Sequence, residues 1–63
     1  MPDFKSRLVA ERDDLADKLE KLDGFLAGNN KHGASDLQIE LLNIQSAAMH
    51  TYLNCLNTRL KNL

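Results

Sequence analysis

Two runs of leucines at helical spacing, separated by a polar segment, set the tightest limit on what this 63-residue chain can fold into. In the first run the apolar residues are separated by seven, four, three and four positions, and the second run continues the same rhythm. Such spacing places the side chains in a narrow stripe on one helix face, which leaves water only by packing against another helix. The stripes are Leu8, Leu15, Leu19, Leu22 and Leu26, then Leu42, Met49, Leu53, Leu56, Leu60 and Leu63.

The pattern predicts an all-α fold, an antiparallel two-helix hairpin that forms a single helical domain over residues 1–63. We expect a helix over about residues 3–26, a loop over 27–34 and a helix over about 35–62, with room for a short extra turn at the N-terminus. Ser35 and Gln38 form a capping-box pattern that marks the start of the second helix. The loop offers glycine and asparagine for turn positions, and its shortness makes the helices fold back on each other.

A hairpin of this size has a thin core, which points to self-association. The single cysteine excludes an internal disulfide, and Cys55, His32 and His50 are too few ligands for a zinc cage. Residues 1–27 carry seven acidic and five basic side chains, whereas the chain from residue 35 onward carries only two of each. A long helix with few charges is typical of one surrounded by protein. We therefore expect a helical homo-oligomer with the second helix at its centre.

Composition and motifs argue against several classes of function. The net charge of −1 gives no basic surface for duplex nucleic acid. No stretch approaches the roughly 20 apolar residues of a membrane span, and no signal peptide is visible, so a soluble intracellular protein is expected. The chain has no glycine-rich phosphate loop, no nucleophile motif and no His–Glu pairing at metal spacing. We therefore expect neither an enzyme nor a bound cofactor or metal.

Phe4 allows two interpretations. Four residues ahead of Leu8, it could extend the apolar stripe, or it could offer a flat surface on which a nucleobase stacks. In the second case a basic side chain would meet a phosphate from the same or a neighbouring copy. The candidate basic residues are Lys5, Arg7, Lys18 and Lys21.

The second helix carries polar residues beside its stripe, and these also allow two interpretations. Gln45, Asn54 and Asn57 either set the register between packed helices or line a ligand site between subunits. Cys55, between two leucines, is predicted to pack as a small hydrophobic residue. The sequence leaves open whether His50 and Tyr52 contribute to a pocket or only to packing.

Two patterns are more specific than the leucines. The first is Arg-Leu-x-x-Glu over residues 7–11, which follows Phe-Lys-x, and the second is Leu-Leu-x-x-Gln-x-x-Ala-Met-x-x-Tyr over residues 41–52. With the leucine stripes they resemble a family of small tailed-phage proteins that act as anti-CBASS sponges for cyclic oligonucleotides. The resemblance covers nearly the whole chain. It implies a hexamer that holds cyclic nucleotide second messengers without hydrolysing them, in the cytoplasm of the infected bacterial host.

The resemblance also implies roles for individual residues. Family members bind cyclic dinucleotides between protomers, where an N-terminal aromatic stacks on bases and a lysine of the first helix meets the phosphates. Phe4 matches the aromatic, in place of the tyrosine of some members, and Lys18 matches the lysine, with Lys21 the alternative one turn further on. An arginine late in the last helix binds cyclic trinucleotides at a separate site in some members, and Arg59 matches it.

A structural or interaction protein remains the alternative hypothesis. A helical hairpin that oligomerises, or that docks on a protein partner without any small ligand, explains every leucine equally well. The two hypotheses differ in what removal of Phe4 or Lys18 does. A sponge would lose ligand binding while its assembly stays intact, whereas a structural module would have no ligand to lose.

Overall fold

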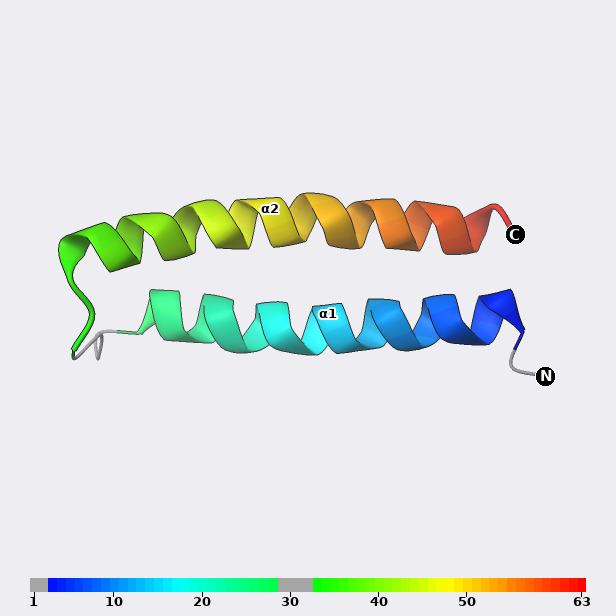
Figure 1. Ribbon diagram of the computed structural model, residues 1–63, viewed down its shortest axis with the longest axis horizontal. Helices are drawn as coiled ribbons and strands as arrows, with labels where there is room; N and C mark the ends of the chain where they lie inside the picture. Colours follow the sequence, from blue (N-terminus) through cyan, green and yellow to red (C-terminus); the bar gives the residue numbers. More distant parts are fainter. Residues whose placement is uncertain (1–2, 29–32) are drawn as a thin grey trace.

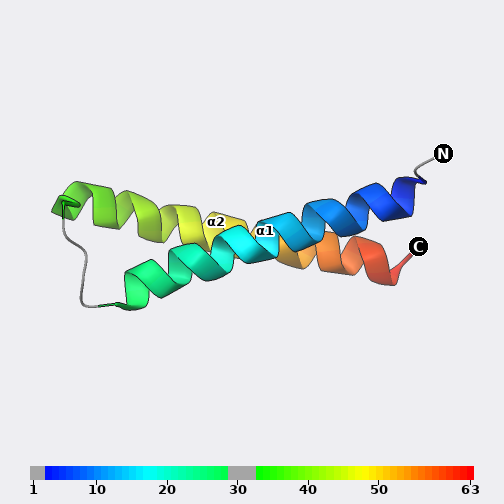
Figure 2. The ribbon, with the colours of Figure 1, turned by 90° about the horizontal axis from the view of Figure 1, so that it is seen from below.

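The computed structural model describes residues 3–28 and 33–63, which form two helices packed as an antiparallel hairpin (Figure 1). Helix α1 spans Phe4–Ala27 and helix α2 spans Asp36–Lys61. The molecule is elongated, with extents of 44 × 18 × 15 Å. The helices cross when seen from below, and α1 begins at the end of the hairpin where α2 stops (Figure 2). The predicted all-α hairpin is confirmed.

Each helix is preceded by an N-cap residue in extended conformation, Asp3 for α1 and Ser35 for α2. The carboxylate of Asp3 accepts a hydrogen bond of 2.6 Å from the backbone N–H of Ser6, and the hydroxyl of Ser35 accepts one of 3.1 Å from Gln38. A side-chain acceptor at this position satisfies one of the unpaired N–H groups of the first turn. Asp3 is thus the cap and not the first helical residue, so α1 starts one residue later than predicted.

The connection between the helices spans residues 28–35, one residue further along the chain than the predicted loop over residues 27–34. Ala27 is still helical, and the N–H of Gly28 donates to the carbonyl oxygen of Phe25 at 3.3 Å, which ends α1. Gly33 has a φ of 83°, a left-handed conformation that glycine adopts without steric cost. Residues 29–32, in the middle of the predicted loop, lie outside the described residues.

The hydrophobic core lies along the seam between the helices and follows the predicted stripes. Four leucines are buried, and Leu56 is completely inaccessible to solvent. Other stripe residues of α2 are partly buried against them. Leu63 is 61% exposed, so its predicted place in the stripe is wrong, because α2 ends at Lys61 and no longer directs it to the seam. The buried residues are Leu8, Leu15, Leu19 and Leu56.

Polar contacts interrupt the apolar seam at two positions along the length of the hairpin. Arg12 donates a hydrogen bond of 3.0 Å to the side-chain oxygen of Asn57, joining α1 to α2. Nearer the connection, the hydroxyl of Ser46 donates to Asp23 at 2.5 Å, and the imidazole of His50 lies 2.7 Å from the other oxygen of the same carboxylate. Polar groups paired in this way favour one register of the two helices over others.

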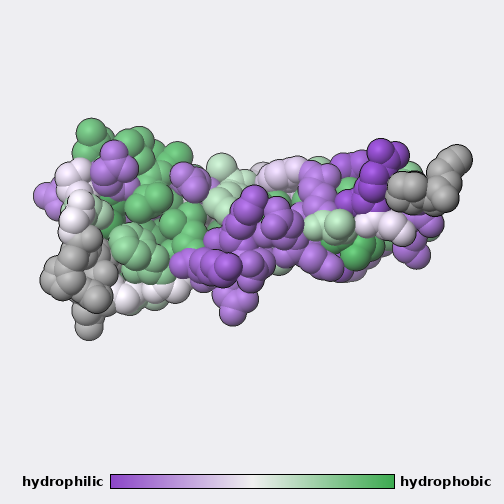
Figure 3. Space-filling view, turned by 60° about the horizontal axis from the view of Figure 1, so that its bottom comes forward, coloured by the Kyte–Doolittle hydropathy of each residue, from purple (hydrophilic) through white to green (hydrophobic). Residues whose placement is uncertain are grey.

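A second apolar stripe on α2 faces away from α1. Leu37, Leu41 and Ile44 follow each other at intervals of four and three residues and are 60%, 47% and 61% exposed. Figure 3 shows hydrophobic surface gathered at the end of the hairpin near the connection, while hydrophilic residues dominate the other end. Cys55, predicted to pack as a small hydrophobic residue, is exposed and does not pack between the two helices of the single chain. In the described part of the chain, neither helix is apolar enough over sufficient length to cross a membrane.

Candidate functional site

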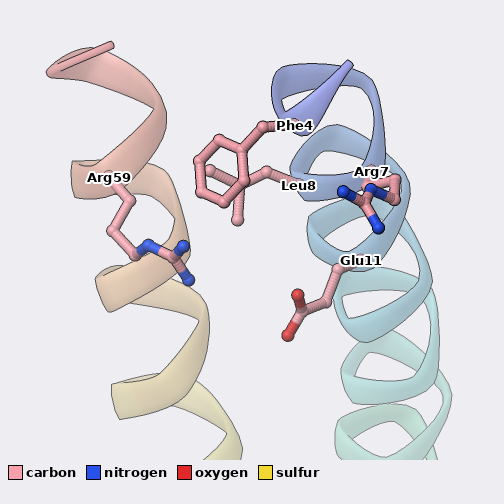
Figure 4. A pocket seen from close by; sticks show the side chains of 5 residues that line it. All are labelled: Phe4, Arg7, Leu8, Glu11 and Arg59. Atoms are coloured by element: carbon pink, nitrogen blue, oxygen red, sulfur yellow. The ribbon is translucent and has the colours of Figure 1, made fainter. Parts of the chain in front are cut away.

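A cavity of about 330 Å³ lies at the end of the hairpin where α1 begins and α2 ends (Figure 4). Four of its lining residues come from the first two turns of α1, and one comes from the last turn of α2. Because the helices run antiparallel, residues from the two ends of the chain meet here. The lining residues are Phe4, Arg7, Leu8, Glu11 and Arg59.

The periodicity of α1 places three of these side chains on one face. Phe4, Leu8 and Glu11 are four and three residues apart, the spacing at which side chains lie above one another on a helix. Leu8 is only 3% exposed and forms the apolar floor of the cavity. Phe4, at the solvent end, remains 55% exposed, so its ring is accessible to a ligand.

Arg59 and Phe4 contact each other across the two helices. The guanidinium carbon of Arg59 lies 5.6 Å from the centre of the Phe4 ring, which is within the range of a cation–π interaction. In Figure 4 the Phe4 ring and the Glu11 carboxylate project from α1 toward α2, and Arg59 reaches toward them from α2. A planar cation therefore lies beside the ring.

Among the charged groups of the cavity, the carboxylate has a hydrogen-bond partner on the other helix, whereas the two guanidinium groups have no carboxylate partner among the described residues. The hydroxyl of Tyr52, on α2, donates a hydrogen bond to Oε2 of Glu11. Within residues 3–28 and 33–63, neither Arg7 nor Arg59 forms an ion pair. Two guanidinium groups can thus meet an anion without first leaving a carboxylate, and guanidinium matches the geometry of phosphate.

The structure brings together three of the five predicted ligand-binding residues. Phe4, Arg7 and Arg59 line one cavity. The resemblance implied a separate trinucleotide site for Arg59, whereas in the single chain Arg59 stands against the aromatic residue expected to bind dinucleotides.

The other two predicted residues lie elsewhere on α1. Lys18 pairs with Asp14 at 3.0 Å and Lys21 pairs with Asp17 at 3.1 Å, each one turn back on the same helix. Both lysine side chains are largely exposed. A single chain therefore does not bring either lysine to the cavity, and only a second copy could do so.

Sequence reasoning assigned no role in a site to Glu11, and it left open whether Tyr52 contributes to a pocket or only to packing. Both residues were present in the two specific patterns, and the spacing of Glu11 from Phe4 already placed them on one helix face. The pairing of Glu11 with Tyr52 spans 41 positions and depends on how α1 and α2 are aligned, which no local pattern encodes.

A second polar cluster lies toward the connection, away from the cavity. Hydrogen bonds from Ser46 and then His50 hold the pKa of the Asp23 carboxyl below its ordinary value of 3.8. This cluster joins the helices but offers few ligands for a metal. No three His, Cys, Asp or Glu side chains of the described ranges gather closely enough to hold a metal ion. His32, considered as a ligand from the sequence, lies outside those ranges.

Comparison with known proteins identifies a family that the chain matches. The model of the Sequestin family matches residues 2–62, which is nearly the entire chain. No curated protein and no solved structure matches significantly. The match includes both helices and all five residues of the cavity. Because the Sequestin family model matches far more than half of the chain, the chain belongs to the Sequestin family.

Proposed function

We propose that this protein binds cyclic di- and trinucleotide second messengers without cleaving them and keeps them from the effectors of a CBASS defence system. It would act for a phage, in the cytoplasm of the infected bacterial host. The observation that carries the proposal is the cavity lined by an exposed aromatic ring and by two guanidinium groups that form no ion pair within the part of the chain that the structure describes. Family membership supports sequestration of a partner, which is a binding role and not a catalytic one.

The chemistry of the cavity suits a nucleotide. A base that stacks on Phe4 contributes roughly 1–3 kcal/mol. Each charge-assisted hydrogen bond from Arg7 or Arg59 to a phosphate oxygen contributes about 1.5–3 kcal/mol. Two such sets of contacts, one for each half of a cyclic dinucleotide, could supply the roughly −12 kcal/mol of a nanomolar site after the cost of association.

The size of the cavity supports a ligand shared between copies. A volume of about 330 Å³ is at the low end of the range for small-molecule sites, and it suits one base with its phosphate better than a whole dinucleotide. A cyclic dinucleotide is nearly two-fold symmetric, and a two-fold interface presents the same residues from both sides. In this arrangement, two copies enclose one ligand, and Lys18 or Lys21 of a neighbouring copy reaches its phosphates.

The exposed stripe of α2 favours a second candidate function, that of a purely structural oligomerisation module. Leu37, Leu41 and Ile44 form an apolar face that α1 does not cover. A module of this kind would assemble through that face and bind no nucleotide. The proposed sponge also requires assembly, so ligand binding distinguishes the two functions.

Titration calorimetry with a panel of cyclic di- and trinucleotides tests the proposal. We expect saturable sub-micromolar binding at fewer than one ligand per chain, and chromatography of the mixture afterwards should recover the ligand intact. The absence of binding to every member of the panel would contradict the proposal and leave the structural module.

Variants of Phe4 locate the binding site. Phe4→Leu keeps an apolar side chain but loses the flat ring, and we expect it to weaken binding by at least about tenfold to a hundredfold, because each of the two copies that enclose the ligand loses the stacking on one base. Phe4→Tyr is the matched control, because it retains stacking, and its affinity should stay close to that of the parent. Circular dichroism should be unchanged for both variants, since Phe4 is 55% exposed. If Phe4→Leu and the parent bind cyclic nucleotides with equal affinity, Phe4 does not contact the ligand.

A further inference from the structure

The outer face of α2, on the side away from α1, carries an uncharged heptad pattern along the whole helix. Its residues follow each other at intervals of four and three, and each of them is exposed in the single chain. This is the spacing of a helix that packs against another helix. The face begins with Leu37, Leu41 and Ile44 and continues with Ala48, Thr51 and Cys55.

This face is suited to an identical, uncharged face. The solvent side of α1 carries ion pairs between residues four positions apart, and covering them would remove charges from water at a high cost in free energy. The outer face of α2 has no such cost. The hydroxyl of Thr51 already donates to the backbone oxygen of Ala47 at 3.2 Å, so burial leaves this donor satisfied.

The size of the side chains along the face determines the direction in which two copies pack. Large aliphatic residues occupy its first half, and Figure 3 shows hydrophobic surface gathered at that end of the hairpin. Small residues occupy its second half, up to Thr58. Parallel pairing would set small against small and leave that half loosely packed. Antiparallel pairing over the full helix sets Leu41 against the partner's Thr58, and Ile44 against the partner's Cys55.

The charges along one edge of the face favour the same direction. Glu40 lies near the start of α2 and Lys61 at its end, exactly three heptads apart and therefore on the same edge. Antiparallel pairing brings Glu40 of each copy beside the partner's Lys61, and the two-fold symmetry forms this contact twice. Charged residues at such edge positions set the orientation of paired helices.

We infer that two copies of this chain pair through the outer face of α2 in antiparallel orientation, about a two-fold axis that passes between Ala48 and Thr51. This interface goes beyond the proposed function and does not depend on it. The pairing holds the Arg59 residues of the two copies roughly 30 Å apart along the helices. It is therefore separate from an interface in which two copies enclose one ligand.

Thiol crosslinking of the whole protein tests the direction of pairing. Cys55 is the single cysteine, and antiparallel pairing keeps the two Cys55 residues roughly 16 Å apart along the helices. A short bismaleimide that cannot span this distance should give little covalent dimer from the parent. Ala48→Cys combined with Cys55→Ser places the thiols next to the axis, and we expect abundant dimer.

Asn43→Cys in the same Cys55→Ser background is the matched control, because position 43 is exposed but lies off the face. Abundant dimer from the parent would indicate parallel pairing, in which each Cys55 meets its own counterpart, and would overturn the inference. If Ala48→Cys gives no more dimer than Asn43→Cys, the two faces do not meet, and the inference is overturned as well.

Exchange of the edge charges tests the alignment of the two helices. Glu40→Lys or Lys61→Glu alone sets like charges together twice, so each should raise the dissociation constant of the dimer at low salt by threefold or more, measured by analytical ultracentrifugation. The double variant Glu40→Lys/Lys61→Glu should restore the parent's value. A double variant that dissociates as readily as the single variants would overturn the alignment.

These measurements use no nucleotide and change no residue that lines the cavity. Failure of the crosslinking test therefore overturns the interface and leaves nucleotide binding standing. Failure of every cyclic nucleotide to bind in calorimetry overturns the proposed function and leaves the interface standing.

Discussion

At the scale of single residues, the position of Arg59 shows how the antiparallel arrangement of the two helices builds the cavity. It lies in the last turn of α2, where a cation also complements the negative end of the helix dipole. The hairpin brings it over Phe4 at the start of α1. Arginine suits this position better than lysine would, because its planar guanidinium can stack on the ring and donate in parallel to a phosphate.

Lys18 gives a prediction at the same scale. It is exposed, and its ion pair with Asp14 contributes only about 0.3–0.5 kcal/mol, as is usual for such surface pairs. Lys18→Ala should therefore leave thermal stability nearly unchanged. If a neighbouring copy places Lys18 on the ligand, calorimetry should show cyclic dinucleotide binding weakened by about tenfold or more.

Lys21→Ala is the matched comparison for this test, since it removes an equivalent charge and an equivalent pair with Asp17 one turn further along α1. Affinity unchanged by Lys18→Ala and reduced by Lys21→Ala would move the role to Lys21. Affinity unchanged by both would restrict the phosphate contacts to the arginines of the cavity.

At the scale of the elements, the contacts that align α1 with α2 are polar as well as apolar. The leucine stripes allow the helices to slide by a whole turn with little loss of apolar contact. Asp23 opposes such a shift, because it has partners on α2 at both Ser46 and His50. The same alignment sets the height of Arg59 relative to Phe4, so the cluster near the connection helps to position the distant cavity.

The lowered pKa of Asp23 makes this contribution depend on pH. A carboxyl whose pKa is lower in the folded state than in the unfolded state stabilises the fold above the unfolded value, here about 3.8. The contribution is lost as pH falls through the folded pKa. We therefore expect Asp23→Asn to melt a few degrees below the parent near neutral pH, and the gap to close well below 3.8.

Melting curves followed by circular dichroism, at equal protein concentration, measure this difference. Asp17→Asn is the control, because Asp17 pairs only within α1 and its loss should affect melting less at neutral pH. If the difference in melting temperature between Asp23→Asn and the parent stays constant down to strongly acidic pH, the ionised carboxylate of Asp23 is not the cause of that difference.

At the scale of the whole molecule, the hairpin buries few apolar side chains for its length. Only four side chains of the described residues are buried, whereas domains of this size generally need a further source of stability. The exposed stripe of Leu37, Leu41 and Ile44 has the heptad spacing of a helix–helix interface and carries no charge. We propose that a second copy of this chain covers it.

Ile44→Asp tests this assembly. A charge at position 44, on the stripe, would have to be buried without a partner, so we expect the variant to sediment as a smaller species than the parent in analytical ultracentrifugation. Asn43→Asp adds the same charge at the neighbouring exposed position, off the stripe, and should keep the parent's mass. A parent that sediments as a monomer at all concentrations would contradict the assembly.

The sequence by itself determined the two helices, their approximate ends and most of the seam between them. These features depend on local physics: the period of the leucines and the hydrogen-bonding capacity of Ser35 at a helix start. Its resemblance to a phage family also singled out Phe4 and Arg59, and the need for a basic partner to a phosphate singled out Arg7, although not as members of one cavity. Local patterns identify the residues of a face but not what that face meets.

Only the tertiary structure decided which side chains meet across the hairpin. The contacts of Arg59 with Phe4, of Tyr52 with Glu11 and of Asp23 with its partners join residues that are distant in sequence. Each requires one particular alignment of α1 against α2, and leucine stripes are compatible with more than one. The site depends on that alignment because its aromatic residue and one of its arginines come from opposite ends of the chain.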